Sequence, residues 1–189
     1  KNDAIKDIKS ILNGKFKSSK KVIIEEFLEG EEASYFVITD GVNFKQIGTA
    51  QDHKRIGEGD TGLNTGGMGA YSPSLLITEE IEKKIIDQII VPTIKGMNEI
   101  GCKYKGILYA GLMIKNNEPK LIEYNIRFGD PECQALMMRL DDDLFDIILS
   151  SVEEKLDNKP VKWSPNPSIT IVAASRGYPE SYETKKEIK

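Results

Sequence analysis

The sequence predicts an α+β fold in which an antiparallel or mixed sheet is flanked by helices. Short runs of strand-forming residues alternate along the chain with segments whose apolar residues recur at helical spacing. Two pairs of these strand-like runs are joined by short turn-forming segments, residues 40–43 and 116–119, as in antiparallel hairpins. The length of 189 residues allows one large domain or two small ones.

The composition is ordinary for a globular protein, with 39% hydrophobic residues, 30% charged residues and a net charge of -4. No basic excess indicates a nucleic-acid partner, and no apolar run approaches the ~20 residues of a membrane span. The first residues show no signal-peptide pattern, so we expect a cytoplasmic protein, and we expect it to be a monomer. Cys102 and Cys133 lack CxxC spacing, which argues against a disulfide framework or a zinc site.

The first predicted elements are a helix and three strands. Isoleucines and a leucine recur at helical spacing over residues 3–13 and stop before Gly14, which predicts an amphipathic helix. Residues 22–30, 34–39 and 44–50 are rich in strand-forming residues, and the last two runs flank an Asp-Gly turn. We therefore expect a strand followed by a hairpin.

The next stretch, residues 51–72, holds six glycines and little apolar periodicity, which predicts an irregular, ligand-shaped loop. Thr78 then precedes three glutamates and a stripe of isoleucines, the pattern of a capped helix. Because proline lacks an N–H and clashes with the preceding turn, we expect Pro92 to kink or end this helix.

The second half of the chain is predicted to contain two strands, two helices and a last strand. These cover residues 106–115, 120–126, 132–140, 143–156 and 168–174. Three prolines before the last strand mark a linker. We expect residues 1–160 to form one region, and residues 161–189 to form the linker and the start of a C-terminal domain.

The strand over residues 120–126 carries candidate metal ligands. Side chains alternate along a strand, so Glu123 and Asn125 share a face that leads to Arg127. A carboxylate and an amide oxygen can both bind Mg²⁺, and a guanidinium can bind the same phosphates. Strand chemistry alone leaves a second interpretation open, in which these polar groups only face solvent.

The segment EYNIRFGDPE, residues 123–132, resembles the signature of the glycinamide ribonucleotide synthetases within the ATP-grasp family. The resemblance implies an ATP-grasp fold. It also implies that Glu123 and Asn125 hold Mg²⁺ or Mn²⁺ on the phosphates of ATP. Arg127 would neutralise charge on the transferring phosphoryl group.

The same resemblance assigns Asp130 a catalytic role beside Arg127, and Gly129 and Pro131 a substrate-binding role. The wider ATP-grasp family commonly has a second acidic ligand on the preceding strand. Here that region reads Tyr-Ala-Gly-Leu from Tyr109, without a carboxylate. We take this difference as a property of the synthetase branch.

Residues 22–34 resemble the hinge that lies beneath adenine in ATP-grasp proteins. The resemblance implies ATP-binding roles for Glu25, Glu26, Phe27 and Leu28 in the hinge, and for Glu32 at the ribose. Strand alternation places the two adjacent glutamates on opposite faces, so only one of them can face the base. A solvated strand end is the alternative interpretation of these acidic residues.

The glycine-rich stretch also resembles the synthetases, where it belongs to the acceptor-substrate side of the cleft. It contains no Gly-Lys-Ser/Thr triplet and is therefore not a Walker A loop. The resemblance implies binding of glycine, phosphoribosylamine or phosphates by Asp52, Lys54, Arg55, Asn64, Thr65, Gly66, Gly67, Met68 and Gly69. His53, the single histidine, is expected to be structural.

The reaction implied by the resemblance joins glycine to 5-phosphoribosylamine at the expense of ATP, through a glycyl phosphate, in purine synthesis. Glycine and 5-phosphoribosylamine would be the small-molecule partners. Two alternatives stay open from the sequence. One is another ATP-grasp carboxylate–amine ligase, and the other is a nucleotide-binding fragment that is inactive on its own.

Overall fold

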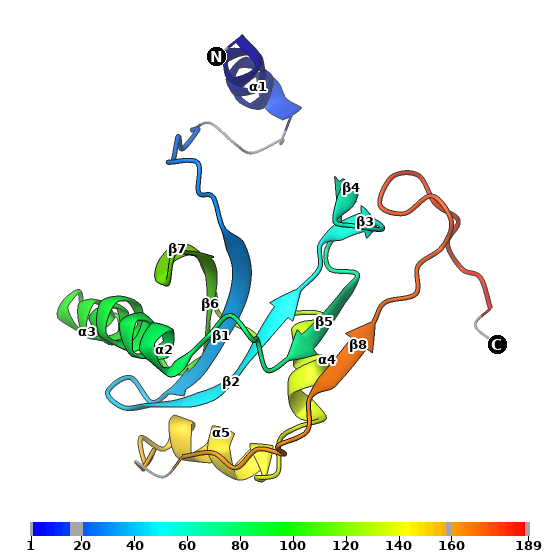
Figure 1. Ribbon diagram of the computed structural model, residues 1–189. Coiled ribbons are helices and arrows are strands. Elements are labelled where there is room, and N and C mark those ends of the chain that lie inside the picture. The colour runs from blue at the N-terminus through cyan, green and yellow to red at the C-terminus, as the bar shows by residue number, and fades with distance from the viewer. Residues whose placement is uncertain (1, 16–20, 158–159, 188–189) are drawn as a thin grey trace.

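The structure is a computed structural model that describes residues 2–15, 21–157 and 160–187. Its strands are β1 (Glu31–Thr39), β2 (Phe44–Asp52), β3 (Arg55–Gly57), β4 (Thr61–Asn64), β5 (Gly69–Ser72), β6 (Gly106–Lys115), β7 (Glu118–Asn125) and β8 (Ser168–Ile171). Within the described ranges, six of them form one sheet in the order β7-β6-β1-β2-β5-β8, with every neighbouring pair antiparallel (Figure 1). The expected antiparallel sheet is confirmed.

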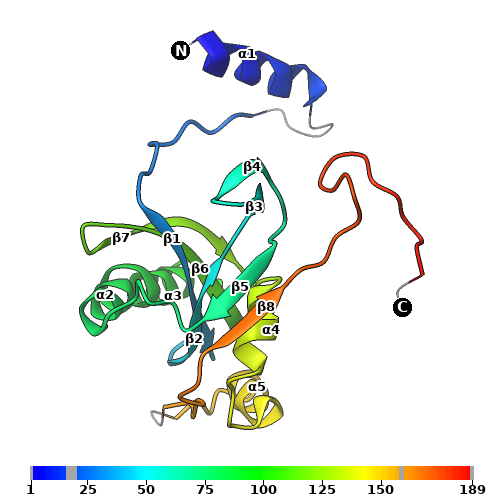
Figure 2. The same cartoon turned by 45° about the vertical axis from the view of Figure 1, so that its right-hand side comes forward.

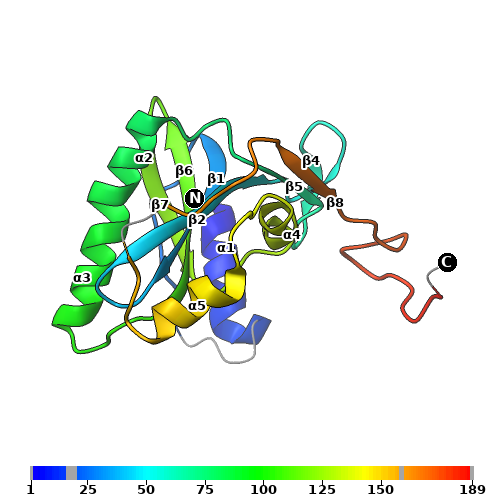
Figure 3. The same ribbon diagram turned by 90° about the horizontal axis from the view of Figure 1, so that it is seen from below.

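Helices lie on both sides of this sheet (Figure 3). One side carries a long helical stretch made of α2 (Glu79–Ile85), a π-helical turn η2 (Ile86–Ile90) and α3 (Val91–Glu99). The other side carries α4 (Glu132–Met137) and α5 (Leu144–Val152). In the part of the chain that the structure describes, no helix is long and apolar enough to cross a bilayer.

The central strand β1 is buried on both faces because its alternate side chains enter two different cores. Tyr35 and Val37 pack with isoleucines of the long helical stretch. Phe36 and Ile38 pack with Leu136 and other residues of the opposite layer. A strand that is buried on both faces has a nearly continuous run of apolar residues, and such a run predicted β1.

The predicted N-terminal helix over residues 3–13 is confirmed. It consists of α1 (Asn2–Ser10) and a continuing π-helical turn, η1 (Ile11–Lys15). None of the α1 residues is buried, and the helix stands apart from the sheet in two views (Figures 1 and 2). Its apolar stripe therefore contributes nothing to the cores of this chain.

The strand predicted over residues 22–30 is wrong. Residues 21–29 are extended but belong to no strand, and the sheet begins only at Glu31. Ile23 and Phe27 are 82% and 86% exposed. A β-branched and aromatic composition favours extended backbone, but a strand also requires a neighbour with which to pair. The segment instead connects α1 to the start of β1 (Figure 1).

The irregular loop predicted over residues 51–72 is also wrong in part. It contains the hairpin β3–β4, and then β5, which pairs with β2 on one edge and β8 on the other (Figure 2). Gly59 and Gly62 have φ values of +66° and +84°, which a residue with a side chain rarely adopts. The glycines thus shape a tight hairpin that periodicity alone does not reveal.

Of the two outcomes expected at Pro92, a kink or the end of the helix, the structure excludes the second. The helical stretch continues to Glu99, and the turn immediately before the proline is the π-helical segment η2. A π turn widens the helix at the place where a proline ring would otherwise crowd the preceding carbonyl. The other predicted helices and strands are present, with ends shifted by a few residues.

Removing the cap of α2 is expected to destabilise the protein by about 1 kcal/mol. The Thr78 hydroxyl accepts a hydrogen bond from the Ile81 N–H at 3.3 Å, and Thr78→Ala removes this acceptor. Urea unfolding would measure the difference, with Thr78→Ser as the control that keeps the hydroxyl. Equal unfolding midpoints for the alanine and serine variants would contradict the capping role.

Candidate functional site

Side chains of four strands converge where β1 begins and β2 ends. They line a pocket of about 130 Å³ that includes Glu32, Asp52, Lys54, Tyr109 and Glu123. A wider hollow of about 360 Å³ shares Glu32, Asp52 and Lys54 with it. These residues are far apart in sequence, and the antiparallel order of the strands brings them together.

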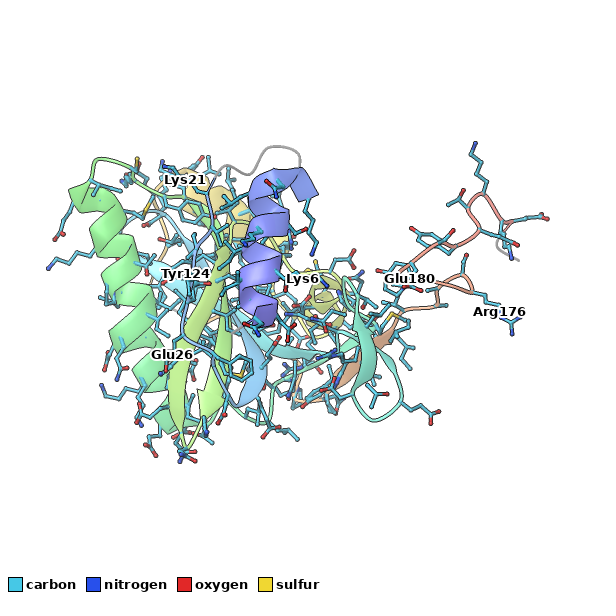
Figure 4. The ribbon with its side chains drawn as sticks, turned by 90° about the horizontal axis from the view of Figure 1, so that it is seen from above. Lys6, Lys21, Glu26, Tyr124, Arg176 and Glu180 are labelled. Carbon is cyan, nitrogen blue, oxygen red and sulfur yellow. The ribbon has the colours of Figure 1, made fainter. Side chains whose placement is uncertain are left out.

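The candidate metal ligands lie together on β7. The Glu123 Oε1 accepts a hydrogen bond from the Asn125 Nδ2 at 3.0 Å. Tyr124, between them, points to the opposite face, where its hydroxyl contacts Thr93 of α3 (Figure 4). The predicted alternation is therefore confirmed here, although a register shift brings Ile122 to the pocket beside Glu123.

The donor chemistry of this pair fits magnesium. A carboxylate and an amide oxygen are hard ligands, and Mg²⁺ usually completes its shell with water and substrate phosphates. Among the described residues, no group of three or more His, Cys, Asp or Glu side chains is arranged to hold a metal ion. A metal at Glu123 and Asn125 would thus depend on phosphate and water for its other ligands.

Arg127 and Asp130 follow β7 on the protein surface. The Arg127 Nη1 donates to the Phe128 carbonyl at 2.8 Å, so the guanidinium lies against its own chain. The Asp130 Oδ1 accepts from the Gln134 Nε2 at 2.8 Å, in the first turn of α4. Both side chains are exposed, and neither lines the pocket or the wider hollow.

Glu132 is a buried carboxylate to which the sequence analysis gave no role. It is 2% exposed and accepts hydrogen bonds from the Tyr109 hydroxyl at 2.8 Å and the Ser34 hydroxyl at 3.2 Å. Burial and the Glu132 charge raise the pKa of Tyr109, which keeps the phenol protonated as a donor. The strand of Tyr109 has no acidic residue at this place, but Glu132 of α4 brings a carboxylate to the Tyr109 hydroxyl.

Gly129 makes room for this carboxylate. A Cβ at position 129 would lie 2.2 Å from the Glu132 Oε2, which is far inside contact distance. The spacing Gly-x-x-Glu in the motif was the available sequence signal for a buried acid close to the backbone. Packing against Glu132 is therefore sufficient reason for a glycine at position 129, apart from its predicted role in substrate binding.

Asp52 lies between the pocket and the glycine-rich segment. Its Oδ1 is buried and has no hydrogen-bond partner among the described residues. Burial, followed by the nearby charge of Glu132, raises the pKa of Asp52 to about 7, against the opposing effect of Lys54. An orphaned buried oxygen of this kind is costly unless a ligand or water satisfies it.

Lys54 is the cation of the site. Its Nζ donates to the Glu32 Oε2 at 2.8 Å. Burial acts to lower the pKa of Lys54, but the bond to Glu32 and the charges of Asp52 and Glu123 outweigh it and raise that pKa. The ammonium group therefore remains charged among three carboxylates from three strands.

The glycine-rich segment closes one side of the site. The Thr65 and Met68 amides donate to the carbonyls of Lys54 and His53, both at 2.7 Å. A Cβ at Gly67 would lie 2.4 Å from the Pro131 Cδ, so the segment touches the turn before α4. The structure thus brings the residues from Thr65 to Gly69 together with Gly129, Asp130 and Pro131.

Arg55 and Asn64 lie farther out, on the β3–β4 hairpin. The Arg55 Nη1 donates to the Gly62 carbonyl at 2.7 Å, within the hairpin. Both residues line the wider hollow but not the smaller pocket. They belong to the rim of the candidate site.

The predicted hinge residues pass along the edge formed by β6 and β7. The Glu26 carboxylate accepts from the Lys120 Nζ at 2.8 Å, as its place beside β7 allows (Figure 4). Glu26, Phe27 and Leu28 line a hollow of about 340 Å³ with residues of the two strands, whereas Glu25 does not. Three consecutive residues thus line one hollow, so the alternation that a strand would give does not hold in this segment.

Comparisons with known proteins agree with one another. The family model described as phosphoribosylglycinamide synthetase, ATP-grasp (A) domain, matches residues 1–133. The chain is 54% identical over 185 residues to a phosphoribosylamine–glycine ligase of Vigna unguiculata, covering 96% of the chain and 60% of the relative. It is 54% identical over 181 residues to the ligase of Vibrio parahaemolyticus, covering 95% of the chain and 42% of the relative.

Solved structures give the same fold. The phosphoribosylamine–glycine ligase of Thermotoga maritima matches with a TM-score of 0.87 and 33% identity, over 96% of this chain and 46% of that one. The biotin carboxylase domain of Hydrogenobacter thermophilus 2-oxoglutarate carboxylase, solved with MgADP, matches with a TM-score of 0.61 and 17% identity, over 87% and 35% of the two chains. The second likeness concerns the fold alone.

Proposed function

Because this chain belongs to the family of phosphoribosylglycinamide synthetase ATP-grasp domains, we propose that it supplies the nucleotide- and metal-binding part of an enzyme that joins glycine to 5-phosphoribosylamine. The products would be glycinamide ribonucleotide, ADP and phosphate, in purine synthesis. The chain spans 60% or less of the length of the ligases described above, so the activity is assigned to a longer polypeptide.

One observation supports this proposal: residues of motifs that are distant in sequence meet at one end of the sheet. Glu123 of β7 and Lys54, which follows β2, line the same pocket. Asn125 donates a hydrogen bond to Glu123, and the Thr65 amide of the glycine-rich segment donates one to the Lys54 carbonyl. These residues supply oxygen ligands for a cation and a positive charge for phosphate, which are components that phosphoryl transfer needs. An exposed strand face that only meets solvent would not require this convergence.

The proposed reaction has two steps. The glycine carboxylate attacks the γ-phosphate of ATP to give glycyl phosphate and ADP, and the amine of phosphoribosylamine then displaces the phosphate. Such chemistry depends on positioning and charge neutralisation. A bound Mg²⁺ or Mn²⁺ would neutralise phosphate charge, held by Glu123 and Asn125, while Arg127 would neutralise the transferring group from the end of β7.

Other residues are assigned by their position around the pocket. Glu26, Phe27 and Leu28 line the hollow beside β6 and β7, which supports a role in binding the base, and Glu25 joins them on sequence resemblance alone. Glu32 is proposed to accept hydrogen bonds from the ribose. The glycine-rich segment and the turn of Gly129, Asp130 and Pro131 are proposed to bind the acceptor substrates.

The remaining proposals rest on the sequence. We propose a cytoplasmic monomer, on the basis of the composition. Residues 1–160 are proposed as the nucleotide- and metal-binding region, and residues 161–189 as the linker and the start of another domain. The last two residues of that second region lie outside the described residues.

Phosphate release from ATP tests the function. The full-length protein that contains this chain is expected to release phosphate only when glycine and an amine acceptor, phosphoribosylamine in the proposed reaction, are both present with Mg²⁺. Greater activity with another carboxylate in place of glycine would assign a different ATP-grasp ligase. Binding of Mg-ATP by calorimetry without any turnover would support a nucleotide-binding protein and contradict the enzyme assignment.

The Glu32→Gln variant is expected to bind Mg-ATP about tenfold more weakly, because a charged acceptor for the ribose is lost. Glu32 also holds the Lys54 ammonium at 2.8 Å, so its loss frees that side chain to move. Calorimetric titration would measure the change. Glu99→Gln, an exposed acid at the end of α3, is the matched control, and equal affinities for the two variants would contradict the assignment.

A further inference from the structure

The phosphoryl transfer proposed above gives no role to Asp52, which lies on the acceptor side of the pocket. Its Oδ1 is buried without a partner among the described residues. That oxygen would lie 3.0 Å from a Cβ at Gly67, so it faces the backbone of the glycine-rich segment. The residue also lines both the pocket and the wider hollow.

The buried carboxylate of Glu132 is close enough for its charge to raise the pKa of Asp52. Glu132 is held in place by the hydroxyls of Ser34 and Tyr109, from β1 and β6. These two donors satisfy one of its oxygens, but they carry no positive charge. The site therefore contains two neighbouring carboxylates, and hydroxyl groups from two strands hold the second of them.

We propose that Asp52 is the proton acceptor for the amine that attacks the acyl phosphate, and that Glu132 is the positioning residue that tunes it. This inference rests on the function proposed above and adds a catalytic step to it. Neither residue was needed for the binding of ATP or metal.

The proton balance of this step is complete. The amine nitrogen forms a bond to the carbonyl carbon of the acyl phosphate, and the bond from that carbon to the phosphate oxygen breaks. The nitrogen loses one proton as the amide forms. The Asp52 carboxylate takes this proton and returns it to the departing phosphate, so no further reactant is required.

The charges around Asp52 suit such an exchange near neutral pH. Burial is the largest effect and the Glu132 charge the second, and both raise its pKa, to about 7. Lys54 and a backbone hydrogen bond from His53 act in the opposite direction, while Glu32 of β1 adds a smaller increase. A base is most effective when its pKa lies near the working pH.

The first experiment compares two nucleophiles on the full-length protein. Hydroxylamine is uncharged at neutral pH and captures acyl phosphates without a base, giving a hydroxamate from glycine and ATP. In Asp52→Asn, the rate with phosphoribosylamine divided by the rate with hydroxylamine is expected to fall about a hundredfold relative to the unmodified protein. An unchanged ratio would overturn the role of Asp52.

The second experiment measures the pH dependence of coupling to phosphoribosylamine. The rate is expected to rise through about pH 7 in the unmodified protein, as Asp52 loses its proton. Glu132→Gln keeps an oxygen acceptor but removes the charge, so this rise is expected to move to lower pH by roughly one unit. Burial remains in the variant and prevents a full return to the ordinary aspartate range.

Two control variants separate the charge of Glu132 from its structural role. Tyr109→Phe removes one hydrogen bond but leaves the carboxylate, so the rise is expected not to move to lower pH. Glu99→Gln alters a distant exposed acid and is expected to change nothing. A shift of equal size in the Tyr109 and Glu132 variants would show a merely structural role and overturn the assignment of Glu132.

Failure of the proposed function gives a different result. If the unmodified full-length protein forms no hydroxamate from glycine, ATP and hydroxylamine, then the glycine-dependent function itself is wrong. If it forms the hydroxamate while Asp52→Asn couples phosphoribosylamine normally, the function stands and only the inference about Asp52 fails.

Discussion

Replacing Glu123 with alanine in the full-length protein is expected to lower metal-dependent turnover by about a thousandfold. The carboxylate is the only charged member of the Glu123–Asn125 pair, whose side chains are joined by a 3.0 Å hydrogen bond. Without it, an amide oxygen alone would hold the cation, and Mg²⁺ binds weakly to one neutral protein ligand. Turnover measured against Mg²⁺ concentration would show both a lower maximum and a higher requirement for metal.

Glu80→Ala is the matched control for this prediction. Glu80 lies in α2, away from the pocket, and its exposed carboxylate pairs with Lys84 at 3.3 Å. Exposed ion pairs contribute little to stability, typically about 0–1 kcal/mol. The control should therefore retain normal turnover, and a normal rate for Glu123→Ala as well would refute the metal assignment.

Replacing Gly67 with alanine is expected to destabilise the protein strongly. Gly67 has a φ of +127°, and a Cβ there would lie 2.4 Å from the Pro131 ring and 3.1 Å from the Asp130 carbonyl. The strained backbone and the clash together should cost about 2–6 kcal/mol. That is a large fraction of the roughly 5–15 kcal/mol that stabilises a typical domain.

Urea unfolding of three alanine variants would separate the two contributions. Gly59 has a positive φ of +66° but no neighbour within 4 Å, so Gly59→Ala reports the backbone cost alone. Gly96 lies in α3 with open space around it, and Gly96→Ala should stabilise by about 0.5–1 kcal/mol. Equal stability of the Gly67 and Gly59 variants would show that the predicted clash does not exist.

The sequence located most elements of the fold because their apolar patterns report burial directly. The β1–β2 hairpin and β6 are buried strands, and their runs of apolar residues predicted them. Residues 22–30 have a similar composition, yet they form no strand, since composition does not specify a pairing partner. The π-helical turn before Pro92 likewise depends on local backbone geometry that residue spacing does not encode.

The candidate site divides in a similar way. Strand alternation correctly placed Glu123 and Asn125 side by side, because it depends only on local geometry. The buried carboxylate of Glu132 was missed, because its partners Ser34 and Tyr109 come from strands distant in sequence. The order of the strands in the sheet brings such partners together, and residue spacing in a single sequence does not show which distant residues will meet.

The outermost strand of the sheet affects how the protein assembles. β8 lies beyond the predicted boundary at residue 160, yet it pairs with β5 from Gly69 opposite Ile171 to Ser72 opposite Ser168. The outer edge of β5 can therefore be covered only after the loop of nearly a hundred residues between β5 and β8 has closed. During synthesis the ribosome must release the chain past residue 171 before this pairing can form, and until then β5 is an exposed edge that only β2 holds.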